Sequence, residues 1–350
     1  MLNLDEKKIR KGKPIGLPYQ GSKKKISKKI IEVIKQNFGT DKPIYDIFGG
    51  GGAITAECIL NGLEVHYNDL DKDITNAFER VISQDREWIK TLIISRTEFT
   101  EIKDKENKAT DDFLKLLINS FGNNKRNYLY SKETSDLKYN LAKEIIEKHD
   151  VFSGYKQTET YKRSIEKHEQ LQQLQRLQQL EQLERLQQLQ QLDEVKATNK
   201  SYHDFSEVSG AILYLDPPYE DTSHEGYINK KNSKKRTVEP EVYKEMREKL
   251  LKLEQGAKIE HDDFIFSLGT DEKPKNRMYC KDTRLASSFD SQEFYDWAFE
   301  MAKTNIVIIS SYSISDGRFE AVYSFDKARS TVQGGTRNDK CEKLFMVKNS

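Results

Sequence analysis

The residues best suited to chemistry form the run Asp216-Pro217-Pro218-Tyr219, which directly follows the apolar segment 211–215. Two prolines after a strand make a stiff turn, and many such turns are only structural. Here the turn combines a carboxylate, a carbonyl and an aromatic face. The Asp216 carboxylate and the Pro217 carbonyl can accept hydrogen bonds from a planar exocyclic amine, while Tyr219 can stack on the base that carries it. The run therefore favours transfer of a methyl group to such an amine, whose lone pair the two acceptors would localise.

A glycine-rich turn lies far upstream, in the run Tyr45-Asp46-Ile47-Phe48-Gly49-Gly50-Gly51-Gly52. Because glycine has no Cβ, such a turn after a first strand lets the backbone approach a ligand closely. The run does not complete the dinucleotide fingerprint, since Thr55 stands where a third glycine is expected, and no Gly-Lys-Ser/Thr of a phosphate-binding loop follows. Taken alone, it fits a tight structural turn equally well.

An acidic segment, Tyr67-Asn68-Asp69-Leu70-Asp71, ends the next predicted strand. An acid about 20 residues beyond a glycine turn is placed to hydrogen-bond the two hydroxyls of a ribose. Asp69 is the better candidate, because it directly follows the strand. The alternative is that this acid caps a helix that begins near Lys72.

Alternating strand and helix patterns supply the scaffold that these motifs need. Strands are predicted at 43–48, 64–67, 211–215 and 306–309, with short candidates near 322 and at 344–347. Helices are predicted at 53–60, 72–83, 239–253 and 292–304, and apolar spacing makes residues 85–120 mostly helical. The order strand, glycine turn, helix, strand, helix predicts an α/β fold with a parallel sheet covered by helices.

Residues 170–192 form a low-complexity tract with 8 Leu, 11 Gln, 2 Glu and 2 Arg, in which leucine recurs at every third position. On an α-helix a three-residue step rotates backward by about 60°, so these leucines spiral around the axis and form no coiled-coil seam. Since Leu and Gln are good helix formers, we expect a helical insert with imperfect packing. A flexible repeat of variable length is the alternative, and neither assigns chemistry to the tract.

The chain has 350 residues with 58 basic and 57 acidic side chains, and the net charge of +1 gives no reason to expect a nucleic-acid partner. The distribution of charge matters more, because binding depends on local patches. Residues 1–29 hold ten Lys/Arg and two acids, and a second basic run comprises Lys230, Lys231, Lys234, Lys235 and Arg236. Either run could also be an ordinary solvated face.

Several classes of protein are disfavoured. No apolar run approaches the ~20 residues that span a bilayer, and residues 1–10 lack the apolar core of a signal peptide. Cys58, Cys280 and Cys341 are odd in number and far apart, so neither a disulfide framework nor a metal site is expected. None of the cysteines lies in a motif for methylation of a cytosine ring carbon. We expect a cytoplasmic protein encoded by a bacterium or a phage.

Together the three motifs, with Pro18-Tyr19-Gln20-Gly21-Ser22-Lys23 upstream, resemble the Dam-like family of adenine-specific DNA methyltransferases in the alpha arrangement. The resemblance covers residues 14–120 and 205–350. It implies a Rossmann-like methyltransferase fold and S-adenosylmethionine as cofactor. It also implies direct transfer of the methyl group to the 6-amino group of a flipped adenine in duplex DNA, without a covalent enzyme intermediate.

The resemblance also carries roles onto residues of this sequence. Asp216, Pro217 and Tyr219 become the implied catalytic residues, and Asp69 the ribose ligand. Tyr19 stands where some relatives have tryptophan, and the tract 170–192 has no counterpart. The implied cofactor contacts are Tyr19, Lys23, Asp46, Phe48, Gly49, Gly51, Asp69 and Asp216.

The implied organisation is a discontinuous catalytic domain, 1–110 with 206–350, around a mainly helical target-recognition insert, 111–205. The polar loop 120–128 predicts DNA contacts, although a plain loop between helices is the alternative. The DNA-binding residues that we expect are Asn123, Asn124, Lys125 and Arg126 in this loop and Lys234, Lys235 and Arg236 after the DPPY run. We expect a monomer that acts on double-stranded DNA, and a cognate restriction endonuclease is one candidate partner.

Two rival functions stay open at this point. A related site could methylate an amine of RNA or a glutamine of a protein, although the glutamine enzymes usually carry Asn before the prolines. Alternatively, the chain could be a non-enzymatic scaffold that associates through the Leu/Gln tract. The DNA recognition sequence does not follow from these residues.

Overall fold

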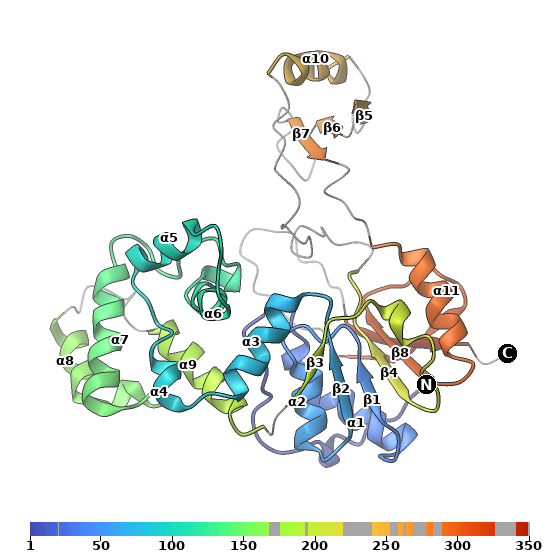
Figure 1. Cartoon of the computed structure of the whole chain (residues 1–350), viewed down its shortest axis with the longest axis horizontal. Coiled ribbons are helices and arrows are strands. Elements are labelled where there is room, and N and C mark those ends of the chain that lie inside the picture. Colours follow the sequence, from blue (N-terminus) through green and yellow to red (C-terminus); the bar gives the residue numbers. More distant parts are fainter. Residues whose placement is uncertain are drawn as a thin grey trace. The chain divides into compact units, whose positions relative to one another are not determined.

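The computed structural model describes residues 1–19, 21–167, 176–192, 195–219, 240–252, 258–261, 264–268, 278–282, 289–325 and 341–348. The chain divides into two compact units (Figure 1). The first comprises Met1–Pro217 with Tyr295–Ser350, and the second comprises Pro218–Phe294. Among the described residues, none of the helices combines the length and the apolar character that crossing a membrane requires.

The first unit is built on a sheet of seven strands in the order β3-β2-β1-β4-β8-β10-β9. Five adjacent strands, from β3 to β8 in this order, run parallel to one another, as the sequence predicts, and β10 is antiparallel to both β8 and β9. The strands are β1 (Ile44–Asp46), β2 (Val65–Asn68), β3 (Ala197–Thr198), β4 (Ile212–Leu215), β8 (Ile306–Ser311), β9 (Phe319–Ser324) and β10 (Lys343–Val347). All four residues of β4 are buried, which explains its uninterrupted apolar sequence. This is the Rossmann-like fold that the sequence predicts.

Helices α1 (Ser27–Phe38) and α2 (Ala53–Leu60) pack on one face of this sheet. Ile30, Ile31 and Ile34 of α1 are fully buried in one cluster with Ile44 and Ile212 of the strands. Helix α2 occupies the predicted span 53–60, and α11 (Ser291–Met301) lies within the predicted span 292–304 except for its first residue. The sequence pattern therefore predicted α2 and α11, whereas α1 was not predicted.

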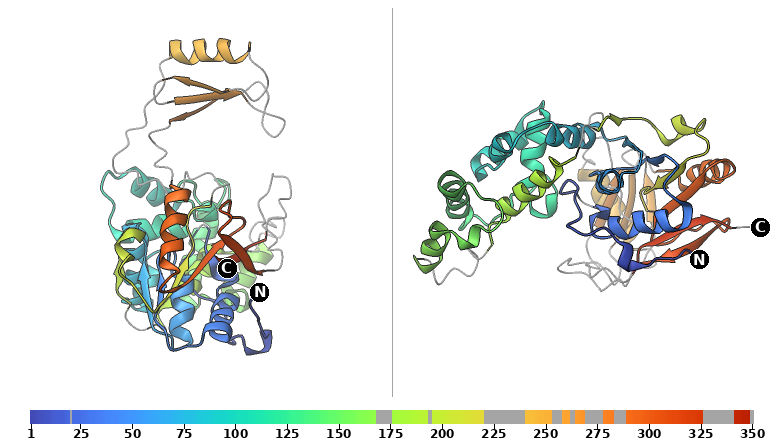
Figure 2. Two further views of the ribbon diagram at one scale, coloured as in Figure 1. Left: turned by 90° about the vertical axis from the view of Figure 1, so that its right-hand side faces the viewer. Right: turned by 90° about the horizontal axis from the view of Figure 1, so that it is seen from below.

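Between β2 and β3 the chain forms a helical region (Figures 1 and 2). Its core joins Phe78 and Leu117 to Leu17, which comes from the N-terminal segment. The predicted insert, 111–205, is the later part of this region together with β3 and the residues that follow it, and its described residues are mainly helical, as expected. Its helices are α3 (Lys72–Ile82), α4 (Arg86–Lys90), α5 (Arg96–Asp104), α6 (Thr110–Ile118), α7 (Ser135–His149), α8 (Glu159–Lys167) and α9 (Gln178–Leu189).

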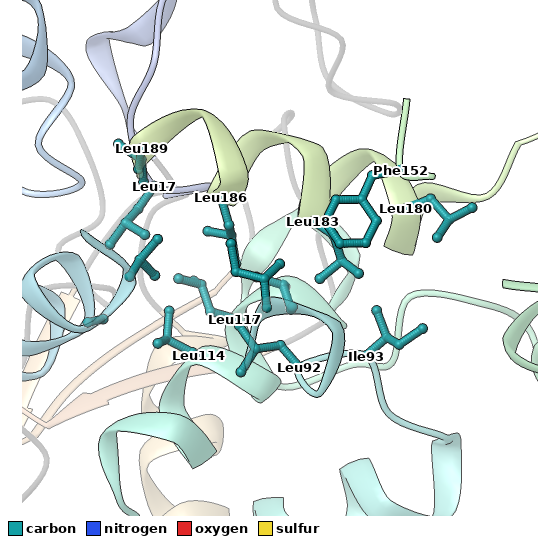
Figure 3. Close-up of a cluster of buried hydrophobic side chains, with 14 of the residues drawn as sticks. Leu17, Leu92, Ile93, Leu114, Leu117, Phe152, Leu180, Leu183, Leu186 and Leu189 are labelled. Atoms are coloured by element: carbon teal, nitrogen blue, oxygen red, sulfur yellow. The ribbon is translucent and has the colours of Figure 1, made fainter. Parts of the chain in front are cut away.

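Helix α9 is the second half of the Leu/Gln tract, and it is a core helix (Figure 3). Leu180, Leu183, Leu186 and Leu189 are each 0% exposed. Steps of three residues sweep about 180° around a helix over four leucines, and α9 contacts α3, α4, α6 and α7 on its different sides. The expected helix is confirmed, but the expected imperfect packing is wrong for residues 177–192. Residues 170–175 lie outside the described part.

The second unit contains an antiparallel sheet and one described helix. Strands β5 (Lys258–His261), β6 (Phe264–Leu268) and β7 (Met278–Asp282) pair in chain order. Helix α10 (Pro240–Leu250) lies within the predicted span 239–253 and buries Met246 and Leu250 in one cluster with Phe266. This sheet was not predicted from the sequence.

Candidate active site

Three carboxylates lie at one edge of the seven-stranded sheet, each at the end of a parallel strand. Asp46 ends β1, Asp69 follows β2 and Asp216 follows β4. Because β1 pairs in parallel with both β2 and β4, the carboxyl ends of the three strands meet. The order of the strands reverses between β1 and β4, and ligands of open α/β sheets bind at such a point.

The turn between β1 and α2 requires glycine for steric reasons. At Gly52 the backbone is left-handed, with φ of 70°, and a Cβ there would lie 2.3 Å from the ring of Phe78. A Cβ at Gly49 would lie 2.5 Å from the ring of Tyr67. Packing alone thus explains these two glycines, since a side chain would displace a buried ring.

The two middle glycines face a different residue. A Cβ at Gly51 would lie 2.9 Å from Cβ of Tyr19, and one at Gly50 would lie 3.1 Å from its ring. The backbone N–H of Leu17 donates to the carbonyl of Gly51 at 2.8 Å, which holds the N-terminal segment against the turn. The structure therefore brings Tyr19 to the predicted cofactor loop, where any Cβ would close the space between them.

Asp46 is buried, and only one of its two carboxylate oxygens accepts hydrogen bonds among the described residues. Its Oδ2 accepts hydrogen bonds from the backbone N–H of Thr55 at 3.1 Å and from the hydroxyl of Thr55 at 2.7 Å. Its Oδ1 is buried without a hydrogen-bond partner among the described residues. Burial raises the pKa of Asp46 to about 7, and the nearby charges of Asp216 and Asp69 act in the same direction. An unmatched buried acceptor of this kind is suited to a cationic ligand.

Asp69 faces the glycine turn. Its Oδ2 accepts from the backbone N–H of Gly50 at 2.8 Å, and its Oδ1 accepts from the backbone N–H of Asp71 at 2.8 Å. Burial raises the pKa of Asp69 to about 6. The alternative of a helix cap applies to Asp71, whose side chain accepts from the backbone N–H of Asp73 at the start of α3. Asp69 therefore does not cap α3, and its carboxylate faces the glycine turn instead.

Asp216 forms an ion pair with Lys23. The Nζ of Lys23 lies 2.6 Å from Oδ1 and 2.7 Å from Oδ2 of Asp216. The two side chains are only 10% and 17% exposed. Burial alone would lower the pKa of Lys23, but the carboxylates of Asp216 and Glu342 raise it above its usual value. Two residues that are 193 positions apart in the chain thus form one ion pair at the site.

Glu342 belongs to the same cluster and was not predicted from the sequence. Its Oε1 lies 3.8 Å from Nζ of Lys23 and accepts a hydrogen bond from the hydroxyl of Ser310 at 2.7 Å. Because β10 runs antiparallel to β8, the start of β10 lies beside the end of β8 at the carboxyl edge. No local motif marks this position, since it depends on the direction of one strand.

The chain matches the family of D12 class N6 adenine-specific DNA methyltransferases over residues 19–262, which is more than half of its length. The chain belongs to this family. Its activity is therefore methylation of the 6-amino group of adenine in DNA, and family membership implies S-adenosylmethionine as the methyl donor. No curated protein is similar enough in sequence to match the chain.

An aromatic cluster of this methyltransferase lies beside the glycine turn, and two of its members, Tyr202 and Trp297, were not predicted from the sequence. The ring of Phe48 lies 6.1 Å from that of Tyr202, which lies 5.1 Å from that of Trp297. The indole N–H of Trp297 donates to Ser206 Oγ at 3.1 Å. Phe48 was expected from its motif, whereas Tyr202 lies in a short 3-10 helix without a recognisable motif.

The run Asp216–Tyr219 lies where the chain passes from the first unit to the second. Pro217 is buried and ends the first segment of the first unit, and Tyr219, which is half-buried, belongs to the second unit. The structure therefore assembles Asp216 with Lys23, while the base-stacking role of Tyr219 remains a prediction.

The predicted DNA-contact loop of this methyltransferase is a tight turn between Ser120 and Tyr128, which form an isolated bridge. Asn123 and Lys125 have left-handed backbones, with φ of 56° and 60°. Three of the expected contact residues also shape the loop, through an Asn123 side-chain bond to Leu117, Asn124 bonds to the backbone and a Lys125 ammonium 4.3 Å from the centre of the Phe113 ring.

Three side chains of this loop are exposed to solvent, those of Phe121, Arg126 and Asn127. Phe121 is 62% exposed, and Arg126 is exposed as well. Arg126 lines a hollow of about 250 Å³ together with Arg96, Thr100 and Lys103 of α5. Arg96, Lys103 and Arg126 thus form a group of positively charged side chains at this loop. The other expected contacts, Lys234, Lys235 and Arg236, lie outside the described residues.

Proposed function

We propose that this chain binds S-adenosylmethionine at the carboxyl edge of β1, β2 and β4 and methylates an adenine that is flipped out of duplex DNA. The observation that carries this proposal is the convergence of Asp46, Asp69 and Asp216 beside a glycine turn. Family membership supplies the reaction. The three carboxylates supply negative charge for a cofactor whose net charge is positive.

The residues present fit the cofactor. S-adenosylmethionine carries one net positive charge, from a sulfonium, an ammonium and a carboxylate, and the site is rich in carboxylates. The unpartnered Oδ1 of Asp46 would accept a hydrogen bond from the cofactor's cationic end. Asp69 would hold the ribose hydroxyls, because each of its oxygens keeps one further acceptor position beside its backbone bond. Tyr19, Lys23, Phe48, Gly49 and Gly51 would complete the cofactor site.

The protein's contribution to the transfer is to hold and polarise the target amine. When bound, the cofactor supplies an electrophilic methyl group on a positively charged sulfur. The Asp216 carboxylate and the Pro217 carbonyl would accept the two amine hydrogens and direct the nitrogen lone pair toward that methyl group. The nitrogen would form its bond to the methyl carbon as the carbon–sulfur bond broke with its electrons going to sulfur, and the methylated nitrogen would then release one proton to solvent. Tyr219 would stack on the flipped base.

The DNA would lie against the loop 120–128. Arg126 would contact a phosphate or a base edge, and the exposed ring of Phe121 would stack on or between bases. Lys234, Lys235 and Arg236 would add phosphate contacts. The proposed division into a catalytic part, 1–110 with 206–350, and a recognition part, 111–205, rests on this assignment. We also propose that the chain acts as a monomer.

The decisive experiment incubates purified protein and radiolabelled S-adenosylmethionine with duplex DNA, or with RNA of the same sequence. Label in DNA only is the expected result, and single-molecule sequencing of that DNA should locate 6-methyladenine in one sequence context. Label in RNA, or in neither nucleic acid, would contradict the proposal. Sequencing also shows whether the modified site is one that a cognate restriction endonuclease would cut.

A further inference from the structure

The carboxylate proposed for catalysis, that of Asp216, is paired with the ammonium of Lys23 in this structure. Lys23 Nζ contacts both oxygens of Asp216, at 2.6 Å and 2.7 Å. An ammonium on both oxygens weakens the carboxylate as an acceptor for another donor. It also opposes the reaction electrostatically, because the target nitrogen gains positive charge as it is methylated. The proposed function therefore requires Lys23 to leave Asp216 at least in part.

A second acceptor for Lys23 is already in place. Glu342 Oε1 lies 3.8 Å from Nζ, so a movement of about 1 Å would bring the two atoms to hydrogen-bond distance. The hydroxyl of Ser310 donates to the same oxygen at 2.7 Å and holds it toward the lysine. The side chains of Lys23 and Glu342 are 10% and 11% exposed, so water would compensate poorly for an ammonium that left Asp216 without this acceptor.

We propose that Glu342 is a positioning residue for catalysis, which takes over Lys23 when the target amine binds to Asp216. The proposal rests on the proposed function, since the target amine is what replaces the lysine. In the reacting complex Lys23 pairs with Glu342, and Asp216 keeps its full charge to stabilise the positive charge that develops on the amine nitrogen. Glu342 acts through Lys23 and does not touch the substrate.

The test compares Glu342→Gln with wild type. Glutamine keeps the shape and an oxygen for Ser310 but loses the charge that attracts Lys23. We expect the rate of methyl transfer in a single turnover at saturating cofactor to fall at least tenfold. Because Glu342 is not itself a proposed cofactor contact, and Lys23 keeps its pair with Asp216 in this variant, Kd for S-adenosylmethionine by calorimetry should change less than threefold. A rate within twofold of wild type would overturn the proposal, as would a loss confined to cofactor affinity.

Two further variants control for folding and charge. Glu320→Gln removes an exposed acid from β9, beside β10, and should leave the rate unchanged. Ser310→Ala removes only the hydroxyl that holds Glu342, so it should slow transfer by a smaller factor than Glu342→Gln and in the same direction. If Glu342→Gln does not fold, a normal rate in folded Ser310→Ala would count against the proposal. Failure of wild type to methylate DNA would instead reject the proposed function.

Discussion

The carboxyl edge of the seven-stranded sheet and helix α9 belong to the same compact unit, but different forces place their residues. At the edge, strand direction brings Asp46, Asp69 and Asp216 together although they are far apart in the chain. In α9, four leucines from a monotonous repeat are buried because neighbouring helices surround them. The motif residues are therefore placed by strand topology, whereas the helix of the repeat is held by the packing of its leucines.

This difference predicts that single substitutions in the two regions fail in different ways. A change at the sheet edge should abolish chemistry in a protein that still folds. A change in α9 should lower the free energy of unfolding while each folded molecule keeps its chemistry. The four predictions that follow test this separation, from the largest expected effect to the smallest.

Asp216→Ala should abolish methyl incorporation, with a loss of about a thousandfold or more, because the amine loses the acceptor that stabilises its developing charge. Cofactor binding should be retained in part, since Asp46 and Asp69 are untouched. Label transfer to DNA and calorimetry with S-adenosylmethionine measure the two effects. A variant that methylates at the wild-type rate would show that Asp216 is not the catalytic acceptor.

Leu183→Ala should destabilise the first unit by about 2–5 kcal/mol, because it removes a fully buried side chain and leaves a cavity. The midpoint of thermal or urea unfolding measures the change. Gln188→Ala, on the half-buried side of the same helix, is the matched control and should shift the midpoint little. Equal midpoints for the two variants would mean that the α9 leucines do not form a core.

The result with Leu183→Ala also bears on the rival scaffold function. The leucines of α9 are buried within the chain, so this part of the tract offers no leucine face for self-association. A drop in stability without a change in oligomeric state would support that conclusion.

Cofactor affinity should fall as the pH falls from 8 to 5.5, by about 10- to 100-fold. Burial raises the pKa of Asp46 to about 7 and of Asp69 to about 6, so both become protonated in this range, whereas a bound cation favours their charged forms. Calorimetry against pH measures the effect. S-adenosylhomocysteine, which lacks the sulfonium charge, should show a weaker dependence, and Asp46→Asn should flatten the curve. Affinity independent of pH would remove both carboxylates from the cofactor site.

The same pKa shifts act on stability with a definite sign. Each acid holds a proton in the folded chain at a pH where the unfolded chain has released it. The stabilisation from Asp46 and Asp69 is therefore complete below about pH 4 and is lost as the pH rises through 6 and then 7 in the absence of cofactor.

Arg126→Ala should have the smallest effect, a loss of DNA affinity of about three- to tenfold together with a decrease of about one in the slope of log affinity against log salt. Arg126 is exposed on the loop and contributes one charge to the DNA contact. Fluorescence anisotropy with labelled duplex at several salt concentrations measures both quantities. Glu101→Gln, an exposed neutralisation on nearby α5, is a control that should not weaken binding. An unchanged salt slope for Arg126→Ala would mean that Arg126 contacts no phosphate.

The sequence by itself determined the motifs, the family and most strands and helices of the first unit. Asp46 and Asp69 were predictable because they lie at fixed places after strands, and α2 because its apolar residues follow a glycine turn. These are local patterns, in which a few neighbouring residues dictate the backbone. The sheet of the second unit and the short β3 escaped prediction, since their pairing depends on partners elsewhere in the chain.

Only the tertiary structure decided which distant side chains meet. Lys23 reaches Asp216, and Glu342 joins them because β10 runs antiparallel beside β8. The structure also decided that Asp71, and not Asp69, caps α3. Likewise, a three-residue leucine spiral forms a packed core only when helices cover several sides of it. Burial and charge pairing are properties of the assembled chain, so the residues carry their chemistry in the sequence and acquire their partners in the fold.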